Sequence, residues 1–240
     1  MIKKDGVSWR ACSDGREGNQ FVVVRHAIGE DIRTQLHYLR GSRFYCNIDL
    51  KEAYTQLRYD DVNGLYVLFI NGRFYRQRRL GMGITNAEFF LQVLISDIFN
   101  FHGIGFDCVL HTADNFLVHA PTELECAERF VQLMDILEYY GLIISPKCEL
   151  LVQRTEYMGL IIEGDSWCKC PRLIKDFIDL SRTKTLGDID TALNRLTFVC
   201  DNIDGFAAIA QDLRKFSFHG RPRDSVRGRT PSTSRDRDRR

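Results

Sequence analysis

Short apolar runs bounded by polar turns predict several β-strands in the first two thirds of the chain. Residues 106–118 contain two such runs around a polar stretch, which suits two short strands joined by a tight turn with Asp114 and Asn115 at its tip. Residues 44–48 form another apolar run, which predicts a buried strand that ends in Asp49 and leads into a helical turn. An acidic side chain is therefore predicted at the end of one strand and at the tip of a hairpin.

Two more hairpins are predicted from the same pattern. Asn71-Gly72 separates the apolar runs 65–70 and 73–79, and this dipeptide is the strongest short hairpin pattern in the chain. Residues 156–163 and 167–171 are predicted to be the two strands of another hairpin, joined by a Gly-Asp-Ser turn.

Helical periods lie between and after these strands. The clearest is amphipathic and spans residues 123–140. Another spans 86–102, and its spacing predicts a buried side made of Phe90, Val93, Leu94 and Ile98. Shorter helical patterns are found at 30–39, 172–180, 186–200 and 206–216. Strands and helices mixed in this way predict an α+β fold.

The two acids give the chain its candidate chemistry. If the strand ending in Asp49 lies beside the hairpin carrying Asp114, the two carboxylates repel each other unless divalent cations lie between them. Such a pair is the core of a two-metal phosphoryl-transfer site, in which the ions are about 3.5–4 Å apart. The plain alternative is a solvated turn, because Asp and Asn are among the commonest turn residues.

Two segments resemble motifs of a known family. Residues 49–54, Asp-Leu-Lys-Glu-Ala-Tyr, resemble the first palm motif of reverse transcriptases, an Asp followed five residues later by an aromatic residue. Residues 112–115, Thr-Ala-Asp-Asn, resemble their Y-x-D-D box with two departures. The resemblance extends over about residues 2–216, is nearest to the LTR-retrotransposon branch, and rests on several motifs in the right order. It implies a right-hand polymerase with a palm, partial fingers and a helical thumb.

The resemblance also implies roles for individual residues. Asp49 and Asp114 would hold two Mg²⁺ (or Mn²⁺) ions with the support of Asn115, and Lys147 would protonate the leaving pyrophosphate. Tyr54 would lie under the sugar ring and exclude a 2′-hydroxyl. The nucleotide-binding set implied by the family is Lys3, Arg10, Leu50, Tyr54, Gly83 and Gln92. The implied primer grip, which would lie along the primer strand, is Tyr157, Met158 and Gly159.

This sequence departs from the family pattern at several positions. Thr112 replaces an aromatic residue that packs near the primer end, and Asn115 replaces a carboxylate while keeping an oxygen ligand. The family usually has Pro at the positions of Gly81 and Glu88, so template contact would be altered. Residues 13–28 keep only part of the fingers pattern, which predicts a chain truncated at its N-terminus.

Several candidate residues also have an ordinary structural interpretation. Tyr54 would then be a core aromatic residue and Lys147 a surface lysine. Lys3 and Arg10 would be the exposed cations of a basic hairpin over residues 2–12, rather than ligands of the triphosphate.

The same comparison suggests how the chain is organised. It implies partial fingers at 1–43, a palm with some fingers elements at 44–165, and thumb or connection helices at 166–216. Residues 217–240 are mostly Arg, Ser, Pro and Asp, which predicts a disordered basic tail.

Composition adds looser limits. A chain of 240 residues that is 44% hydrophobic can bury one large core or two modest ones. No apolar run approaches the roughly 20 residues of a membrane span, and the start Met-Ile-Lys-Lys-Asp is no signal peptide, so we expect an intracellular protein without a membrane partner, in cytoplasm or nucleus. Eight scattered cysteines without a C-x-x-C pair argue against zinc. The tail carries +5 and the rest −4, so any positive groove must be local.

We therefore expect template-directed DNA synthesis by nucleotidyl transfer to a primer 3′ end. The expected partners are an RNA or DNA template with its primer and deoxynucleoside triphosphates; the sequence does not indicate an oligomeric state. One alternative is a degenerate, non-catalytic protein of the same fold that binds nucleic acid or acts as a scaffold. A nucleotide cyclase is a weaker alternative, because the usual Gly-Gly hairpin before the acids is missing.

Overall fold

The computed structural model describes residues 14–26, 29–61, 63–172, 193 and 205–219. The chain divides into two compact units, Met1–Cys168 and Lys169–Arg240. None of the helices in the described part of the chain combines the length and the apolar character that crossing a membrane requires.

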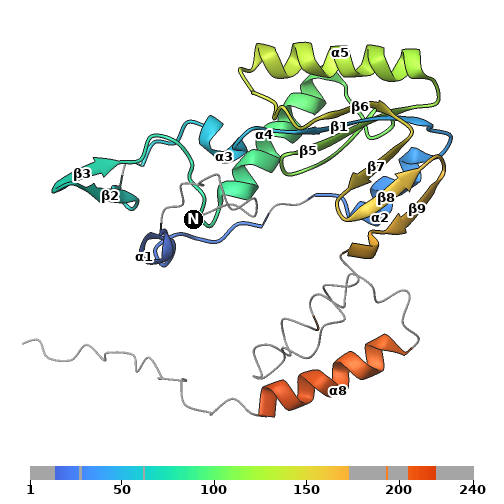
Figure 1. Ribbon diagram of the computed structural model, residues 1–240. Helices are drawn as coiled ribbons and strands as arrows, with labels where there is room; N and C mark the ends of the chain where they lie inside the picture. The colour runs from blue at the N-terminus through green and yellow to red at the C-terminus, as the bar shows by residue number, and fades with distance from the viewer. Residues whose placement is uncertain (1–13, 27–28, 62, 173–192, 194–204, 220–240) are drawn as a thin grey trace, which may run out of the picture. The chain divides into compact units, whose positions relative to one another are not determined.

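The first unit is built on a four-stranded antiparallel sheet with the strand order β4-β5-β1-β6 (Figure 1). Its strands are β1 (Phe44–Asp49), β4 (Val109–Thr112), β5 (Asn115–Ala120) and β6 (Glu149–Val152). The predicted strand ending in Asp49 and the predicted hairpin around Asp114 are both confirmed, and they are neighbours in this sheet. β4 is one edge of the sheet, and β1 and β5 form its centre.

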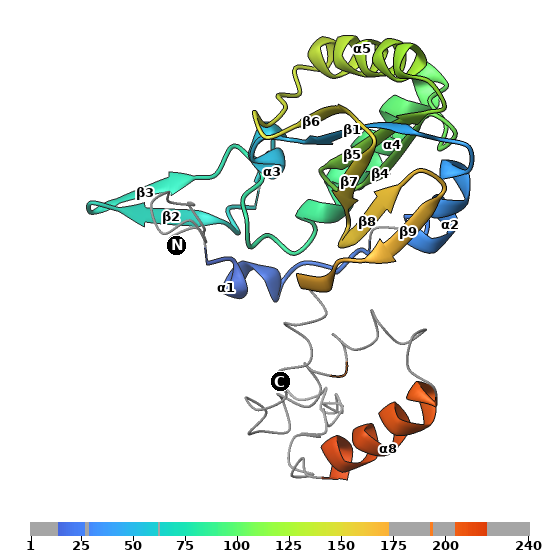
Figure 2. The ribbon, with the colours of Figure 1, turned by 45° about the vertical axis from the view of Figure 1, so that its right-hand side comes forward.

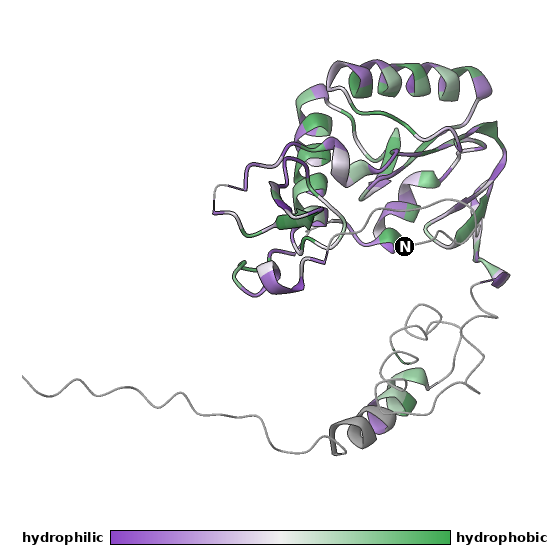
Figure 3. Cartoon of the chain, turned by 60° about the vertical axis from the view of Figure 1, so that its left-hand side comes forward, coloured by the Kyte–Doolittle hydropathy of each residue, from purple (hydrophilic) through white to green (hydrophobic). Residues whose placement is uncertain are grey.

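Helices α4 (Ala87–His102) and α5 (Glu123–Tyr139) cover one face of this sheet. Both helices share one core cluster with alternate residues of β1 and β5, which places them on the same face. That cluster includes Cys46, Ile48, Phe116 and Val118 from the strands, Leu91 and Ile95 from α4, and Leu133 and Leu137 from α5. Green and purple alternate along α5 in Figure 3, as the amphipathic pattern predicts.

A small second sheet covers the other face. Its strands β7 (Arg154–Tyr157), β8 (Leu160–Glu163) and β9 (Ser166–Lys169) lie in that order. Asn47 of β1 joins the two sheets, because its amide nitrogen donates to Thr155 Oγ1 at 3.0 Å and to the Glu156 carbonyl at 2.8 Å. Tyr45, two residues before Asn47 on β1, donates its hydroxyl to the Gly164 carbonyl at 2.7 Å. Residues 45, 47 and 49 therefore face away from the two long helices.

The segment before β1 covers the open edge of strand β4. This segment forms α2 (Ile32–Leu36) and the short 3₁₀ helix η1 (His37–Leu39), which together match the predicted helix over 30–39. Asp31 caps α2, since its side chain accepts from the Arg33 amide. Gln35 Nε2 donates to the His111 carbonyl at 3.3 Å and thereby occupies the open edge of β4.

The β2–β3 hairpin projects from the rest of the first unit (Figure 2). Strands β2 (Val67–Ile70) and β3 (Arg73–Arg76) are joined by Asn71 and Gly72, whose φ angles are +50° and +78°. Positive φ at both central residues is what an Asn-Gly turn favours, so this hairpin is confirmed as predicted.

Short helices connect these parts. α3 (Ala53–Gln56) follows β1, and α1 (Arg16–Asn19) packs against the turn before α4. Asn19 Nδ2 donates to the Gly83 carbonyl at 2.8 Å, and a Cβ on Gly15 would collide with that same carbonyl oxygen. Gly83 has a φ of +104°. Glycine at these two positions therefore permits close approach within the chain itself.

Two details of the predicted elements were wrong. α4 buries Leu91, Ile95, Ile98 and Phe99, whereas Phe90 and Val93 are 42% and 41% exposed. Apolar residues occur on more than one side of this helix, so periodicity alone chose the wrong stripe. The predicted strand 156–163 is broken by a turn at Met158-Gly159, where both φ angles are positive.

The second unit is described by α8 (Phe206–His219) and a few further residues. The predicted helix over 206–216 is confirmed, and Ala210 on it is buried. The helices predicted at 172–180 and 186–200 and the predicted disordered tail at 217–240 lie largely outside the described residues.

Candidate nucleotidyl-transfer site

The register of the central sheet brings the predicted acids together. β1 and β5 pair over six residues, and Asp49 lies directly opposite Asn115. Residues opposite each other in an antiparallel pair have Cα atoms about 4.5–5.5 Å apart and side chains on the same face. Asp114 precedes Asn115, and its carbonyl accepts from the Leu50 amide at 3.0 Å. Asp49, Asp114 and Asn115 are thus gathered at one end of the sheet, and all three are half-buried.

The hairpin turn that carries Asp114 is tight and strained. Thr112 pairs with Asn115, so the two-residue tip is Ala113-Asp114, one position earlier than predicted. Ala113 has a φ of +52°, a left-handed conformation that a residue with a Cβ adopts only at a cost. Asn115 Nδ2 donates to Asp114 Oδ1 at 3.2 Å and helps to orient the carboxylate.

The turn is held by residues from two helices. Gln92 of α4 is 7% exposed, and its Oε1 accepts from the Ala113 amide at 3.1 Å. Gln35 of α2 donates to the Thr112 hydroxyl at 3.5 Å. These contacts hold the turn at the strained residue and at the residue before it.

Tyr54 lies beside the same carboxylate. Burial raises the pKa of the Tyr54 hydroxyl, and the negative charges of Asp114 and Glu88 raise it further. Tyr54 also packs against the main core cluster, as its structural interpretation predicts. Glu88 at the start of α4 is therefore a second acid close to the Tyr54 hydroxyl.

Strained backbone is concentrated around these residues. Among the residues that the structure describes, five non-glycine residues have positive φ, and three of them are Glu52, Ala113 and Met158. Glu52 lies in the loop after Asp49, and Met158 lies in the turn of the predicted primer grip. Strain of this kind persists where the surrounding structure over-determines the backbone, which is common at functional sites.

Lys147 lies in a loop that is attached to the end of β1. The Ser145 amide donates to the Asp49 carbonyl at 2.6 Å, and the Lys147 amide donates to the Ser145 hydroxyl at 3.3 Å. The Lys147 side chain is exposed. The loop therefore brings a cation to the same end of the sheet as the acids.

The predicted primer-grip residues differ in how far they reach solvent. Tyr157 is 1% exposed; burial raises the pKa of its hydroxyl, and Thr112 is the neighbouring side chain that opposes the rise. Met158 is 40% exposed, and Gly159 completes the turn with a φ of +79°. Tyr157 thus supports the Thr112–Asn115 hairpin, while Met158 is available at the surface.

Two residues of the predicted nucleotide-binding set also have structural roles within the chain. The Leu50 side chain is 2% exposed and belongs to the core, so only its backbone takes part in the site. The close approach at Gly83 is made by Gly15 and Asn19 of this chain. Lys3 and Arg10 lie outside the described residues.

The donor atoms fit a hard divalent cation. Carboxylate and amide oxygens of Asp49, Asp114 and Asn115 are the ligands that Mg²⁺ and Mn²⁺ prefer, and Mg²⁺ is commonly held by one or two carboxylates with water and substrate phosphate. Residues 14–26, 29–61, 63–172, 193 and 205–212 contain no group of three or more His, Cys, Asp and Glu side chains placed to hold a metal. A cation held by these two carboxylates would therefore need water or substrate phosphate oxygens as its remaining ligands.

The sequence analysis did not identify the buried polar residues that pack beside the β4–β5 hairpin. Gln35 is 1% exposed and contacts both Thr112 and the His111 backbone, and His111 is itself 6% exposed. One indication was present, since Gln35 lies within the helical period formed by Ile32, Leu36 and Leu39 and so places an amide next to a buried stripe.

Comparison with solved structures identifies the fold. A foamy viral protease-reverse transcriptase in complex with double-stranded DNA has a TM-score of 0.76 and 18% identity, over 92% of this chain and 38% of that one. The protein in complex with an RNA/DNA hybrid gives 0.71 and 18%, over 87% and 28%. A further complex with double-stranded DNA gives 0.73 and 19%, over 91% and 45%. Neither a known family model nor a curated protein matches the chain.

The fold is therefore reverse transcriptase-like. The chain spans less than half the length of the solved proteins that it matches. At this level of identity the likeness concerns the fold, and chemistry has to be argued from the residues of the site.

Proposed function

We propose that the chain is the polymerase part of a reverse transcriptase of the LTR-retrotransposon type, which adds deoxynucleotides to a primer 3′ end on an RNA or DNA template. The observation that carries this proposal is the register that sets Asp49 opposite Asn115 and beside Asp114 within a reverse transcriptase-like fold. The finer division into fingers, palm and thumb is part of the proposal.

The residues of the chain divide the work between them. Asp49 and Asp114 hold Mg²⁺ or Mn²⁺ with the amide oxygen of Asn115; when bound, the cations supply charge stabilisation for the attacking and leaving oxygens. Tyr54, beside Asp114, limits the space at the sugar. Gln92 holds the hairpin through Ala113, and Lys147 offers a proton to the pyrophosphate. Lys3 and Arg10 are proposed to bind the triphosphate.

Primer extension by the purified chain tests this proposal. We expect extension of a DNA primer on RNA and on DNA templates with Mg²⁺ or Mn²⁺, and a loss of at least about hundredfold on Asp114→Ala. Asp97→Ala is the matched control, because Asp97 is an exposed acid on α4 outside the site. No extension with either cation, or equal loss in both variants, contradicts the proposal.

A non-catalytic, nucleic-acid-binding protein is the second candidate. Its supporting observation is the bond from Asn115 to Asp114, because an amide donor satisfies this carboxylate without a cation. This candidate predicts that primer–template binds, that no extension follows, and that Asn115→Asp does not restore extension.

The metal site has a test that does not need activity. Asn115→Asp places a third carboxylate beside Asp49 and Asp114, where like charges repel. We expect the thermal midpoint of this variant to fall in EDTA and to recover with millimolar Mg²⁺, whereas the wild-type midpoint changes less. A midpoint of the variant that is indifferent to Mg²⁺ contradicts a cation site between these residues.

A further inference from the structure

The outer side of α5 carries apolar side chains that no described element covers. Leu124, Val131 and Tyr139 are 71%, 55% and 80% exposed. Together with Glu128 and Asp135, which are also exposed, they follow one another at intervals of three or four residues and form one stripe. This α5 stripe lies opposite the side of the helix that enters the core, and α5 is the outermost element there in Figures 1 and 2. Single exposed apolar residues are ordinary, but an apolar stripe indicates a contact surface.

The β2–β3 hairpin has a second surface of this kind. Phe69 pairs with Phe74 and Val67 with Arg76, so these four side chains lie on one face of the hairpin, called here the phenylalanine face. The two phenylalanines are 64% and 77% exposed, and Val67 and Arg76 are exposed as well. The hairpin projects from the rest of the unit (Figure 2). Its phenylalanine face is therefore open to a partner.

The two surfaces have opposite charge. Residues 63–79, which include the hairpin, contain four arginines and no acid. Residues 80–146, which include α5, contain nine acids, no lysine and a single arginine. That arginine, Arg129, is already paired with Glu125 at 2.6 Å. A basic apolar surface and an acidic apolar surface are thus both present on the same unit of the chain.

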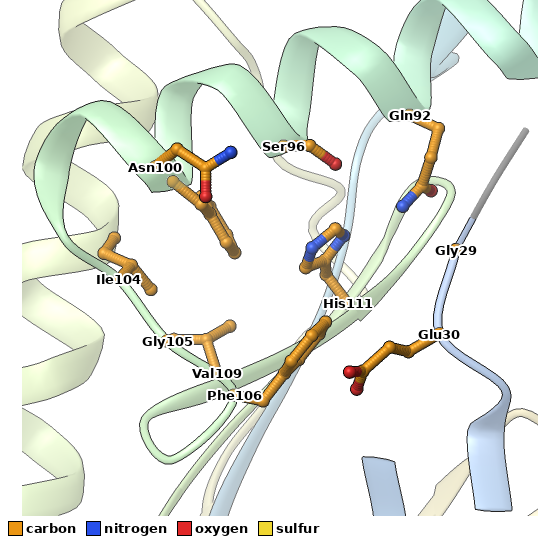
Figure 4. A pocket seen from close by; sticks show the side chains of 11 residues that line it. Gly29, Glu30, Gln92, Ser96, Asn100, Ile104, Gly105, Phe106, Val109 and His111 are labelled. Carbon is orange, nitrogen blue, oxygen red and sulfur yellow. The ribbon is translucent and has the colours of Figure 1, made fainter. Parts of the chain in front are cut away.

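Neither surface belongs to the candidate site. α5 covers the face of the sheet that is opposite to Asp49 and Asn115. A cavity of about 300 Å³ lies beside β4, where Gln92, Ser96 and Asn100 of α4 form one wall (Figure 4). The residues that line this cavity include none from α5 and none from the β2–β3 hairpin. Neither the proposed polymerase chemistry nor the cavity therefore accounts for the two surfaces.

We propose that the α5 stripe binds the β2–β3 hairpin of a second copy of this chain. The phenylalanine face covers the apolar residues of the stripe, and Arg73 and Arg76 pair with Glu128 and Asp135. Both surfaces are exposed within one unit, so the contact forms between copies and not within one. A single kind of partner then accounts for both surfaces. The proposal does not depend on polymerase activity.

A nucleic-acid strand is the other partner that arginine and aromatic side chains suggest. It fits the hairpin less well, because the phenylalanine face has one arginine among three apolar side chains, whereas the phosphates of a strand are neutralised by several cations. It also leaves the α5 stripe without a role, since an acidic surface repels phosphate. The observations therefore favour a second copy.

Sedimentation of the full chain in the absence of nucleic acid tests the proposal. We expect the chain to associate with a dissociation constant on the order of 10–100 µM, because a hairpin on one helix is a small interface. The affinity should fall at least about tenfold between about 50 mM and about 500 mM NaCl, since salt screens exposed charges. A chain that stays monomeric at about 200 µM in low salt overturns the proposal.

Charge reversal identifies the two surfaces. Arg73→Glu with Arg76→Glu should weaken association at least about tenfold, and so should Glu128→Lys with Asp135→Lys. A mixture of these two variants should associate about as tightly as the wild type, because every hairpin then meets a stripe of opposite charge. Failure of the mixture to associate overturns the proposal.

A matched control separates this effect from net charge. Arg40→Glu with Arg43→Glu changes the net charge by the same amount at exposed positions before β1, outside both surfaces. Its affinity should stay within about twofold of the wild type. Equal weakening in the control and in the hairpin variant overturns the proposal.

An uncharged pair of variants provides a second measurement. Val131→Ser removes an apolar contact from the stripe and should weaken association about five- to tenfold. Val93→Ser removes an exposed valine of α4 outside the stripe and should leave the affinity unchanged. If a charge-reversed variant does not fold, this pair still decides, and equal affinities in the pair overturn the proposal.

A nucleic-acid partner for the hairpin gives a different result. The wild type would then sediment as one chain, and a short single-stranded oligonucleotide would lose its binding in Arg73→Glu with Arg76→Glu. That combination overturns the contact between copies. Association of the wild type without an oligonucleotide, restored by mixing the charge-reversed variants, supports it.

Discussion

The two hairpins of the first unit are held in opposite ways. β2–β3 is almost entirely exposed and is stabilised from within, by its Asn71-Gly72 turn and by the cross-strand pair Phe69–Phe74 with ring centroids 4.9 Å apart. β4–β5 is mostly buried, and its turn places Ala113 in a left-handed conformation that the residue type does not favour. One hairpin is specified locally, and the other is imposed by its neighbours.

This difference explains where strain is stored. The turn of β4–β5 keeps its shape because Gln92, Gln35 and Leu50 bond to it from three separate elements. The strained residue is the one immediately before Asp114. Tertiary contacts that stabilise a strained residue next to a candidate functional group are the pattern expected of a functional site. The β2–β3 turn is instead stabilised by its own residue types.

Acid should affect the buried hairpin most strongly. Burial lowers the pKa of His111 from 6.5 to about 4 and also lowers that of His119, while β2–β3 has no histidine. A depressed histidine pKa gives stability that is fully present above pH 6.5 and is lost as pH falls to 4, here about 3 kcal/mol from His111. Urea unfolding between pH 7.5 and 4 measures it.

His111→Phe is the control for that effect, because carboxylates also titrate in this range. The slope of unfolding free energy against pH should be shallower in the variant than in the wild type. Identical slopes would show that His111 titrates normally and is not buried as described.

Removal of the Gln92 acceptor should be the next largest effect. Gln92→Leu leaves the Ala113 amide without its partner next to a left-handed residue, and we expect about 2 kcal/mol of destabilisation. Asn100→Leu, at an exposed position on the same side of α4, should change stability by less than about 0.5 kcal/mol. Equal effects in chemical denaturation would mean that Gln92 does not hold the turn.

Gly72→Ala probes the locally specified hairpin. Gly72 has a φ of +78°, and nothing lies within 4 Å of an added Cβ, so the cost is backbone strain alone, about 1 kcal/mol. Primer–template binding and extension should be unaffected by this change. A loss of primer–template binding or of extension would show that β2–β3 contributes to the site. The contrast between the two hairpins would then be wrong.

Ala113→Gly should have the smallest effect, with the opposite sign. Glycine relieves the left-handed strain but adds freedom to the unfolded chain, so we expect stability to rise by a few tenths to about 1 kcal/mol. Thermal unfolding of the two glycine-related variants side by side is the measurement. A fall in stability on Ala113→Gly would show that the turn is not strained at this residue.

The difference between local and tertiary stabilisation also explains which elements could be predicted from the sequence. The Asn71-Gly72 hairpin, the strand ending in Asp49 and the helix over 123–140 follow local patterns and were found. The Ala113-Asp114 tip and the Met158-Gly159 turn were missed or shifted, since neither carries a local preference strong enough to place it. At the site, the acids were predicted by family motifs, but Gln35 and His111 act through packing from distant segments, which no local pattern encodes.

The meeting of Gly15 and Gly83 has a consequence for how substitutions are tolerated. Only Gly83 belongs to a recognisable motif, yet a side chain on Gly15 would strike the carbonyl oxygen of Gly83. In a saturation library scored for folded protein, position 15 should therefore tolerate substitution as poorly as position 83. No substitution at one of these positions should rescue a damaging substitution at the other.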